Sequence, residues 1–191
     1  MSTTAATVPA TSRPAAAAAT YRIDPAHASA QFKVRHLMVS NVRGELGEVN
    51  GEVTYDAAAP DRARVIARID ATAIDTRNAD RDAHLRSADF LDVAHHPAIE
   101  FRSTAVRAAG PGALEVAGEL TIRGVTRPVT LDVELSDEVR DPWGNVKRGV
   151  TATARLDRRA FGLTWNAALE TGGVVVGERV DVTIEAELVR E

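Results

Sequence analysis

Five histidines are the side chains of this 191-residue sequence best suited to proton transfer or metal binding. They are His27, His36, His84, His95 and His96. None lies in an HExxH pattern or another known ligand spacing. Three could still converge in space, as catalytic zinc requires, although adjacent His95 and His96 point apart in an extended segment. An enzyme or metal site that uses His36 and His84 therefore stays open as an alternative function.

The other common nucleophiles give no catalytic pattern. The chain has no cysteine, which excludes a disulfide framework, a thiol nucleophile and a thiolate metal site. The five serines after residue 20 include no GxSxG elbow. The sequence therefore predicts no catalytic residue, no metal ligand and no cofactor.

A cationic cluster lies in the segment from Ile74 to Asp92, which is the one part of the sequence that does not alternate like a strand. Its members Arg81, His84 and Arg86, together with His36, could bind a polar or phosphorylated head group through charge-assisted hydrogen bonds at the mouth of a cavity. The alternative is a solvated crossover in which these arginines pair with nearby aspartates. Those aspartates are Asp80, Asp82, Asp89 and Asp92.

The same segment predicts a short helical cap. Asp75 or Thr76 is suited to the N-cap position. Two acid-before-base pairs, Asp80 with His84 and Asp82 with Arg86, have the i,i+4 spacing that stabilises a helix. We expect about three turns, followed by Phe90 and Leu91 as apolar anchors that dock the cap on a larger body.

Almost all of the remaining sequence alternates apolar and polar residues with period two, which predicts half-buried antiparallel strands. The clearest run is Leu114, Val116, Gly118, Leu120 and Ile122. Residues 42–56 are interpreted as one long strand with glycine bends. About eight such strands with short turns predict an all-β fold, an extended eight-stranded antiparallel barrel with a short α-helical cap. Small interior residues leave room for one ligand.

Composition limits the partners and the domain organisation. A net charge of −4, a pI near 5.8 and 4% aromatic residues argue against a nucleic-acid partner. Residues 1–20 are interpreted as a disordered Ala/Thr/Pro-rich leader without the features of an export signal, and residues 21–191 as one barrel domain. We therefore expect a cytoplasmic protein. No apolar run is long enough to predict a membrane span.

Several strings in order resemble the YceI-like proteins over about residues 21–189. They are FKVRHLMVSNVRGELGEVNGEV, IDTRNADRDAHLRSADFLDVAHHPAIEFRST, GELTIRGVTRPVTLDVE and DPWGNVKRGVTATARLDRRAFGLTWNAALETGGVVVGERV. The resemblance implies a lipocalin-like barrel that binds a long isoprenoid or other amphiphilic lipid chain. It also implies a role in stress response or isoprenoid-quinone metabolism, and no catalytic residue. Many relatives are periplasmic, and they often carry more aromatic residues where this chain has Gly44 to Glu48.

The predicted function is non-enzymatic binding or carriage of such a lipid, because each buried methylene contributes about 0.8 kcal/mol without any head-group contact. A protein-interaction module or a homodimer is compatible with it, since strands that project past the rim could pair between chains. The residues predicted to line the pocket share an apolar side chain on the inner face. They are Phe32, Val34, Val53, Tyr55, Ile69, Phe101, Leu120, Leu131, Val133, Phe161, Trp165 and Ile184.

Overall fold

The structure is a computed structural model that describes residues 18–168 and 172–191. The strands in this part of the chain are β1 Ala19–His36, β2 Ser40–Glu45, β3 Val49–Tyr55, β4 Arg64–Asp70, β5 Ala98–Gly110, β6 Ala113–Ile122, β7 Val125–Leu135, β8 Val139–Arg140, β9 Val146–Asp157 and β10 Val176–Arg190. The helix is α1, Ala79–Arg86, and three 3-10 segments are η1 Pro60–Arg62, η2 Ala71–Ala73 and η3 Arg158–Phe161. None of the helices described here is long and apolar enough to cross a bilayer.

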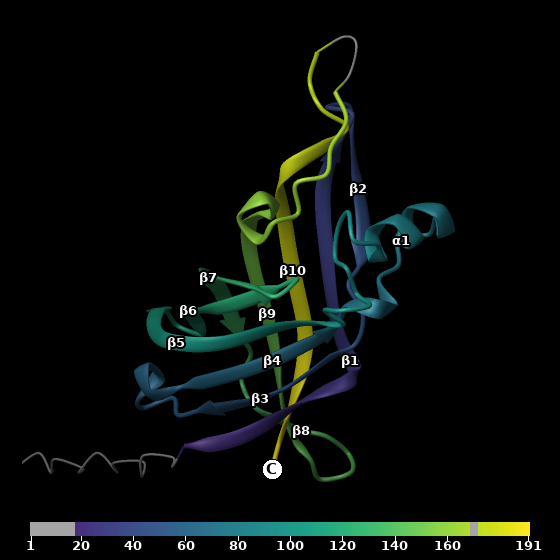
Figure 1. Cartoon of the computed structure of the whole chain (residues 1–191). Coiled ribbons are helices and arrows are strands. Elements are labelled where there is room, and N and C mark those ends of the chain that lie inside the picture. The colour runs from purple at the N-terminus through teal and green to yellow at the C-terminus, as the bar shows by residue number, and fades with distance from the viewer. Residues whose placement is uncertain (1–17, 169–171) are drawn as a thin grey trace, which may run out of the picture.

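Within the described residues, eight strands close into the predicted antiparallel barrel (Figure 1). The ladder runs from β1 through β3, β4, β5, β6, β7 and β9 to β10, which pairs back with β1. β2 and β8 lie outside this ring, where β2 pairs with the far half of β1 and β8 with the start of β9. The prediction of an eight-stranded barrel with a short helix is confirmed.

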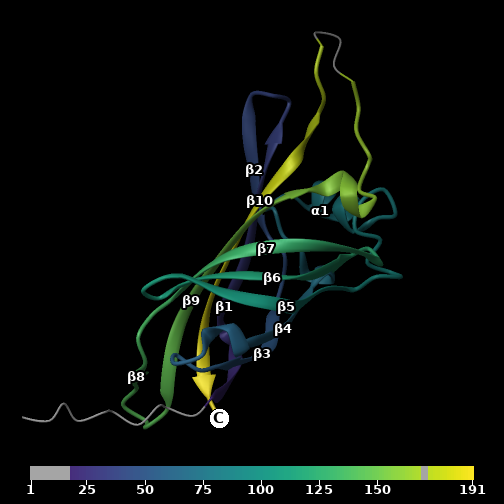
Figure 2. The ribbon, with the colours of Figure 1, turned by 90° about the vertical axis from the view of Figure 1, so that its left-hand side faces the viewer.

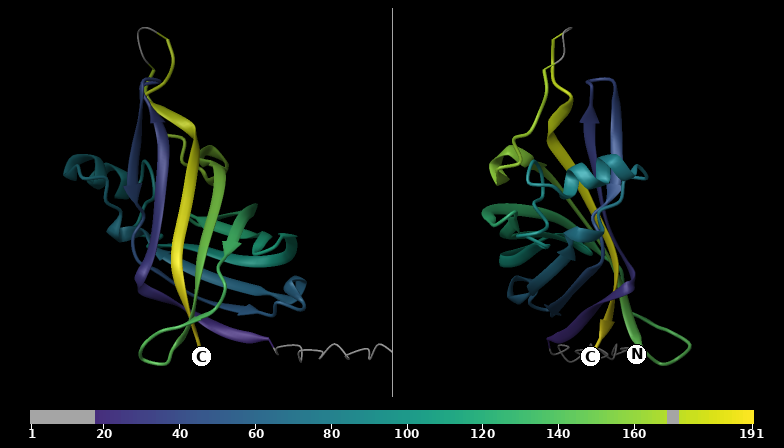
Figure 3. Two further views of the ribbon diagram at one scale, coloured as in Figure 1. Left: turned by 180° about the vertical axis from the view of Figure 1, so that it is seen from behind. Right: turned by 45° about the vertical axis from the view of Figure 1, so that its right-hand side comes forward.

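The barrel is not closed evenly along its length. β7 pairs with β6 from Val125 onward but with β9 only over Asp132–Leu135. On the opposite side, β3 pairs with only the first residues of β1, Ala19–Arg22. The two groups of strands therefore diverge toward one end, as the long β1, β9 and β10 and the crossing β3 to β7 show in Figure 2. The segment with α1 and the segment with η3 lie at this splayed end (Figure 3).

Residues 42–56 do not form the single strand that their alternation predicts. They divide into β2 and β3 because the two halves pair with opposite ends of β1: Phe32 lies opposite Gly44, whereas Tyr21 lies opposite Val53. The break falls at Gly47, which has a left-handed φ of 121°. A Cβ there would lie 2.0 Å from the carbonyl oxygen of Asp70, so only glycine fits this close approach.

The first strand begins two residues before the predicted start of the barrel domain at residue 21. Ala19 and Thr20 pair with Tyr55 and Thr54 in the barrel, and Ala19 is buried. The structure therefore extends the barrel domain to Ala19. Residues 1–17 of the predicted leader lie outside the described residues.

The cap is shorter than predicted, and its N-cap is different. α1 has eight residues, about two turns, and the side chain of Asn78 caps it by accepting a hydrogen bond from the Arg81 backbone N–H at 2.9 Å. Asp75 instead accepts from the Arg77 backbone N–H, in a turn where Arg77 has a φ of 62°. Thr76 is buried under the helix, so neither predicted residue is free to cap it.

A buried carboxylate holds this cap together. Asp82 is 6% exposed and accepts hydrogen bonds from both the backbone N–H and the hydroxyl of Thr76, at 2.9 and 2.5 Å. Burial raises the pKa of Asp82, but the hydrogen bonds from Thr76 and the charges of Arg86 and Arg81 outweigh it, so the pKa lies below its usual value. Charged Asp82 thus ties the helix to the preceding loop.

We predict that Asp82→Ala lowers the free energy of unfolding by about 1.5–3 kcal/mol, because Thr76 loses a charged acceptor in a buried site. Asp80→Ala is the matched control, since Asp80 is an exposed carboxylate in the same first turn. Chemical denaturation of both variants measures the difference. Equal stabilities would contradict a structural role for the buried carboxylate.

The same carboxylate predicts a pH dependence. A pKa that is lower in the folded state gives stability that is fully present above the unfolded pKa of about 3.9 and is lost as the pH falls through the folded value. We therefore expect the stability gap between wild type and Asp82→Ala to narrow as the pH falls below about 4. Denaturation curves measured from pH 7 into the acid range test this expectation. A gap that stays constant would contradict it.

Candidate functional site

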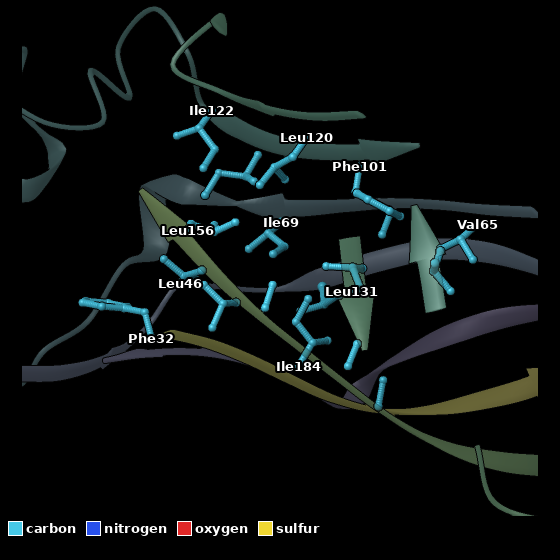
Figure 4. Close-up of a pocket in the computed structure, with 18 of the residues that line it drawn as sticks. Phe32, Leu46, Val65, Ile69, Phe101, Leu120, Ile122, Leu131, Leu156 and Ile184 are labelled. Atoms are coloured by element: carbon cyan, nitrogen blue, oxygen red, sulfur yellow. The ribbon is translucent and has the colours of Figure 1, made fainter. Parts of the chain in front are cut away.

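The interior of the barrel contains a cavity of about 240 Å³. Its walls consist of Ala, Val, Leu, Ile and Phe side chains, with Tyr55 and Arg158 as the exceptions. Figure 4 shows side chains from both groups of strands converging on this space, among them Leu131 and Ile184. An apolar wall of this kind offers a hydrocarbon chain dispersion contacts and exclusion of water.

The structure places eleven of the twelve predicted pocket residues in the cavity wall. They are Phe32, Val34, Val53, Tyr55, Ile69, Phe101, Leu120, Leu131, Val133, Phe161 and Ile184. Period-two alternation identified all of them except Phe161, which lies in η3, because a barrel turns one face of every strand inward. Their contact with a ligand stays a prediction.

Trp165 is the residue that does not line the cavity. Its ring lies outside, 4.6 Å from the ring of His84 and 5.4 Å from that of Phe90. Trp165 follows η3 in a segment without regular structure, so no alternation fixes the direction of its side chain. The placement is therefore a correction to the predicted lining.

The cap contributes four lining residues that the strand pattern does not identify. Ile74, Leu85, Phe90 and Leu91 all face the cavity, and Ile74, Phe90 and Leu91 are buried. Phe90 and Leu91 were expected to anchor the cap, and the structure shows that what they contact is the cavity itself. The cap is thus one wall of the cavity at the splayed end of the barrel.

The arginines predicted to meet a head group donate to backbone carbonyls instead. Arg81 donates through Nε to the Thr76 hydroxyl at 2.7 Å and through a terminal nitrogen to the Thr76 carbonyl at 2.8 Å. Arg86 donates to the carbonyls of Thr72 and Ile74, at 2.7 and 2.5 Å. Both guanidinium groups therefore hold the loop before α1 in place, and a head-group role for them stays a prediction.

The ion pairs considered for this segment are also not those observed. His84 pairs with Asp89 at 3.0 Å, not with Asp80, and its ring packs edge-on against Phe90 and Trp165. Asp82 contacts Thr76 and makes no ion pair with Arg86. The burial of Thr76 explains the difference, because it draws the carboxylate away from the helix surface. His36 ends β1, opposite Val176 and Ser40, and is partly exposed.

Arg158 is a buried cation that the sequence patterns do not identify. It is 6% exposed, and its guanidinium donates to the carbonyls of Leu163, Trp165, Val176 and Gly177 at 2.5 to 3.2 Å. Burial lowers its pKa from the ordinary value, although an arginine remains charged at neutral pH. These bonds fasten η3 and the following segment to β10, while the side-chain stem joins the cavity wall.

One cluster within the described residues has the donor set of a metal site, and it includes neither His36 nor His84. Asp24, His27 and Glu187 bring their ligand atoms within 4.8 Å of one another on the outside of the barrel. The ammonium of Lys147 lies 2.8 Å from Glu187 and 3.7 Å from Asp24. A cation already occupies the cluster, so the arrangement is that of an ion network beside the bulge of β1.

Solved structures with low sequence identity share this fold. A Burkholderia cenocepacia protein, BcnA, aligns with a TM-score of 0.76 at 19% identity over 86% of this chain and 98% of its own. A Campylobacter jejuni YceI protein aligns with a TM-score of 0.70 at 24% identity over 82% and 90%. A domain from Saccharophagus degradans aligns with a TM-score of 0.63 at 14% identity over 90% and 98%.

Sequence comparison gives closer relatives. A UPF0312 protein of Vibrio cholerae is 41% identical over 151 residues, which cover 78% of this chain and 80% of the relative. One from Ectopseudomonas mendocina is 38% identical over a stretch of the same length, which covers 78% and 79%. The YceI-like domain profile matches residues 21–188, nearly all of the described barrel. Fold, sequence match and apolar cavity agree, and the chain belongs to the YceI-like family.

Proposed function

We propose that this protein binds the hydrocarbon chain of an isoprenoid or related amphiphilic lipid inside its barrel and carries it without chemical change. The apolar cavity supports this proposal above all else, because nearly every lining side chain is aliphatic or phenyl. The related Saccharophagus degradans structure is described as a polyisoprenoid-binding domain, so an isoprenoid is the first probe to test. A role in stress response or in isoprenoid-quinone metabolism belongs to the same proposal.

The size of the cavity determines how much of a chain fits. A methylene group is about as large as a water molecule, whose share of liquid volume is about 30 Å³. The 240 Å³ cavity therefore holds roughly eight methylene-sized groups without side-chain movement. At about 0.8 kcal/mol each, they contribute on the order of 6 kcal/mol before the cost of association. The rest of a longer chain would extend through the splayed end.

The distribution of hydrogen bonds supports a position of the polar head outside the cavity. Arg158 uses its guanidinium on four backbone carbonyls, and Arg81 and Arg86 use theirs on the cap loop. An uncharged or charged head would therefore stay near the mouth and in water, which avoids the cost of burying it. Selectivity would depend on the thickness and flexibility of the chain more than on the head group.

The cytoplasmic location expected from the sequence, and the homodimer that is compatible with it, are also part of this proposal. Cell fractionation of the full chain tests the location. Size-exclusion chromatography with light scattering tests the dimer.

We predict that protein purified from its host under mild conditions carries an apolar chain. Extraction with organic solvent followed by mass spectrometry should release a roughly stoichiometric lipid, since a chain in this cavity is shielded from water. A second measurement adds a fluorescent polyprenyl probe to lipid-free protein and follows its uptake. An extract without lipid, together with no uptake of the probe, would leave the proposal without support.

We further predict that Val133→Trp displaces the lipid while the barrel stays folded. Val133 is buried in the cavity wall on β7, so the larger ring should project into the space that the chain would fill. In a filled core this change would cost about 1–3 kcal/mol through overpacking, whereas a hollow interior accepts it at lower cost. Probe binding and thermal unfolding measure the two effects.

Thr130→Trp is the matched control, because Thr130 is an exposed residue of the same strand. It should bind the probe as the wild type does. Strong destabilisation by Val133→Trp, or loss of probe binding in both variants, would indicate a packed barrel and contradict a binding cavity.

A further inference from the structure

Three consecutive large apolar residues are exposed at the end of the β1–β2 hairpin. Leu37, Met38 and Val39 are 40%, 55% and 79% exposed, and together we call them the apolar tip. The hairpin extends beyond the barrel at its splayed end (Figures 1 and 2). A contiguous apolar group on the surface is typical of an interaction site.

The backbone of the apolar tip does not favour these residue types. Leu37 and Met38 have φ values of 51° and 58°, and the Val39 N–H donates to the His36 carbonyl at 3.0 Å. Turns with two central residues at positive φ favour Asn and Gly, because a bulky side chain is strained there. The turn geometry does not explain Leu and Met at these positions, and their exposed side chains are available for a contact outside the barrel.

The apolar tip is continuous with the cavity wall. Phe32 and Val34, on the same strand, line the cavity. The Leu37 N–H donates to the carbonyl of Val175 at 2.8 Å, and the next residue, Val176, lines the cavity from β10. The apolar tip therefore directly follows, on β1 and beside β10, the strand segments whose side chains line the cavity.

Positive charge flanks the apolar tip in a chain whose net charge is −4. Residues 34–44 contain Arg35 and Arg43 and no acidic residue. Arg35 donates to the Met38 carbonyl at 2.9 Å, which places its charge beside the apolar residues, and Arg43 is exposed on β2. Apolar residues flanked by cations fit the headgroup region of a membrane with anionic lipids.

We propose that the apolar tip docks on the surface of a lipid bilayer with anionic headgroups, so that cargo passes between the bilayer and the cavity along β1 and β10. This inference rests on the proposed function and names its partner. Docking shortens the path that an apolar chain must travel through water, which is the main barrier to transfer.

The test compares variants in co-sedimentation with vesicles made from equal parts of phosphatidylglycerol and phosphatidylcholine. Leu37→Asn/Met38→Gly creates the Asn-Gly turn that this backbone favours, so its melting temperature should equal or exceed that of the wild type. We expect its vesicle binding to fall by more than about tenfold, because two apolar side chains no longer enter the bilayer. Arg43→Gln should weaken binding about fivefold on these vesicles and not on pure phosphatidylcholine.

Trp143→Ser is the matched control. Trp143 is 84% exposed in the β8–β9 turn at the opposite end of the barrel, and Asp141 holds the backbone of that turn. Loss of this exposed ring should leave vesicle binding unchanged. Binding that persists in Leu37→Asn/Met38→Gly, or that disappears in Trp143→Ser, would overturn the proposal. Failure of the wild type to bind any vesicle would also overturn it and would direct attention to a protein partner.

Uptake of a soluble fluorescent polyprenyl probe, measured without vesicles, separates this inference from the proposed function. Leu37→Asn/Met38→Gly should take up the probe as the wild type does, because the cavity is unchanged. If neither the wild type nor the double variant takes up the probe, while the wild type still binds vesicles, the cavity assignment fails and the docking surface stands. If the double variant loses both activities, the apolar tip belongs to the cavity and the docking proposal fails.

Discussion

The closure of the ring of strands is the constraint on which the cavity depends. An interior made of aliphatic side chains has nothing to satisfy an unpaired backbone N–H or C=O, so each strand of the ring must find partners on both sides. β10 meets this requirement by pairing along nearly its whole length with β1 on one side and β9 on the other. The barrel can then remain hollow without a polar interior.

The strands do not pair completely at the splayed end. There, buried or bridging arginine side chains donate hydrogen bonds to backbone carbonyls. Arg158 donates to two carbonyls in the segment after η3 and to two in β10. Arg81 and Arg86 donate to carbonyls of the cap loop. Arg123 adds a bridge between the Gly162 carbonyl, after η3, and the Ala88 carbonyl in the cap segment, at 3.0 and 2.6 Å. Planar guanidinium groups suit this task because one side chain satisfies several acceptors at fixed angles. These arginines near the cavity thus act as hydrogen-bond donors to backbone carbonyls.

This use of arginine explains which features could be predicted from the sequence. Alternation assigns the inner face of each strand, and it correctly placed Leu120, Val133 and Ile184 in the cavity wall. It carries no information about Arg158 or Trp165, whose surroundings depend on residues far away in the sequence. The division between β2 and β3 was missed for a related reason, since it results from pairing with two distant parts of β1.

Because the interior is hollow, the stability of the folded protein should depend on whether a lipid chain fills the cavity. In engineered cores each Å³ of void costs about 24 cal/mol, so an empty space of 240 Å³ corresponds to on the order of 6 kcal/mol. A chain of about eight methylenes gains a free energy of similar size when it leaves water for the cavity. Any chain that fills the space stabilises the folded state by mass action. Because the wall is apolar and the arginines are occupied, each added carbon should strengthen binding until the chain reaches the splayed end, and further carbons should contribute less.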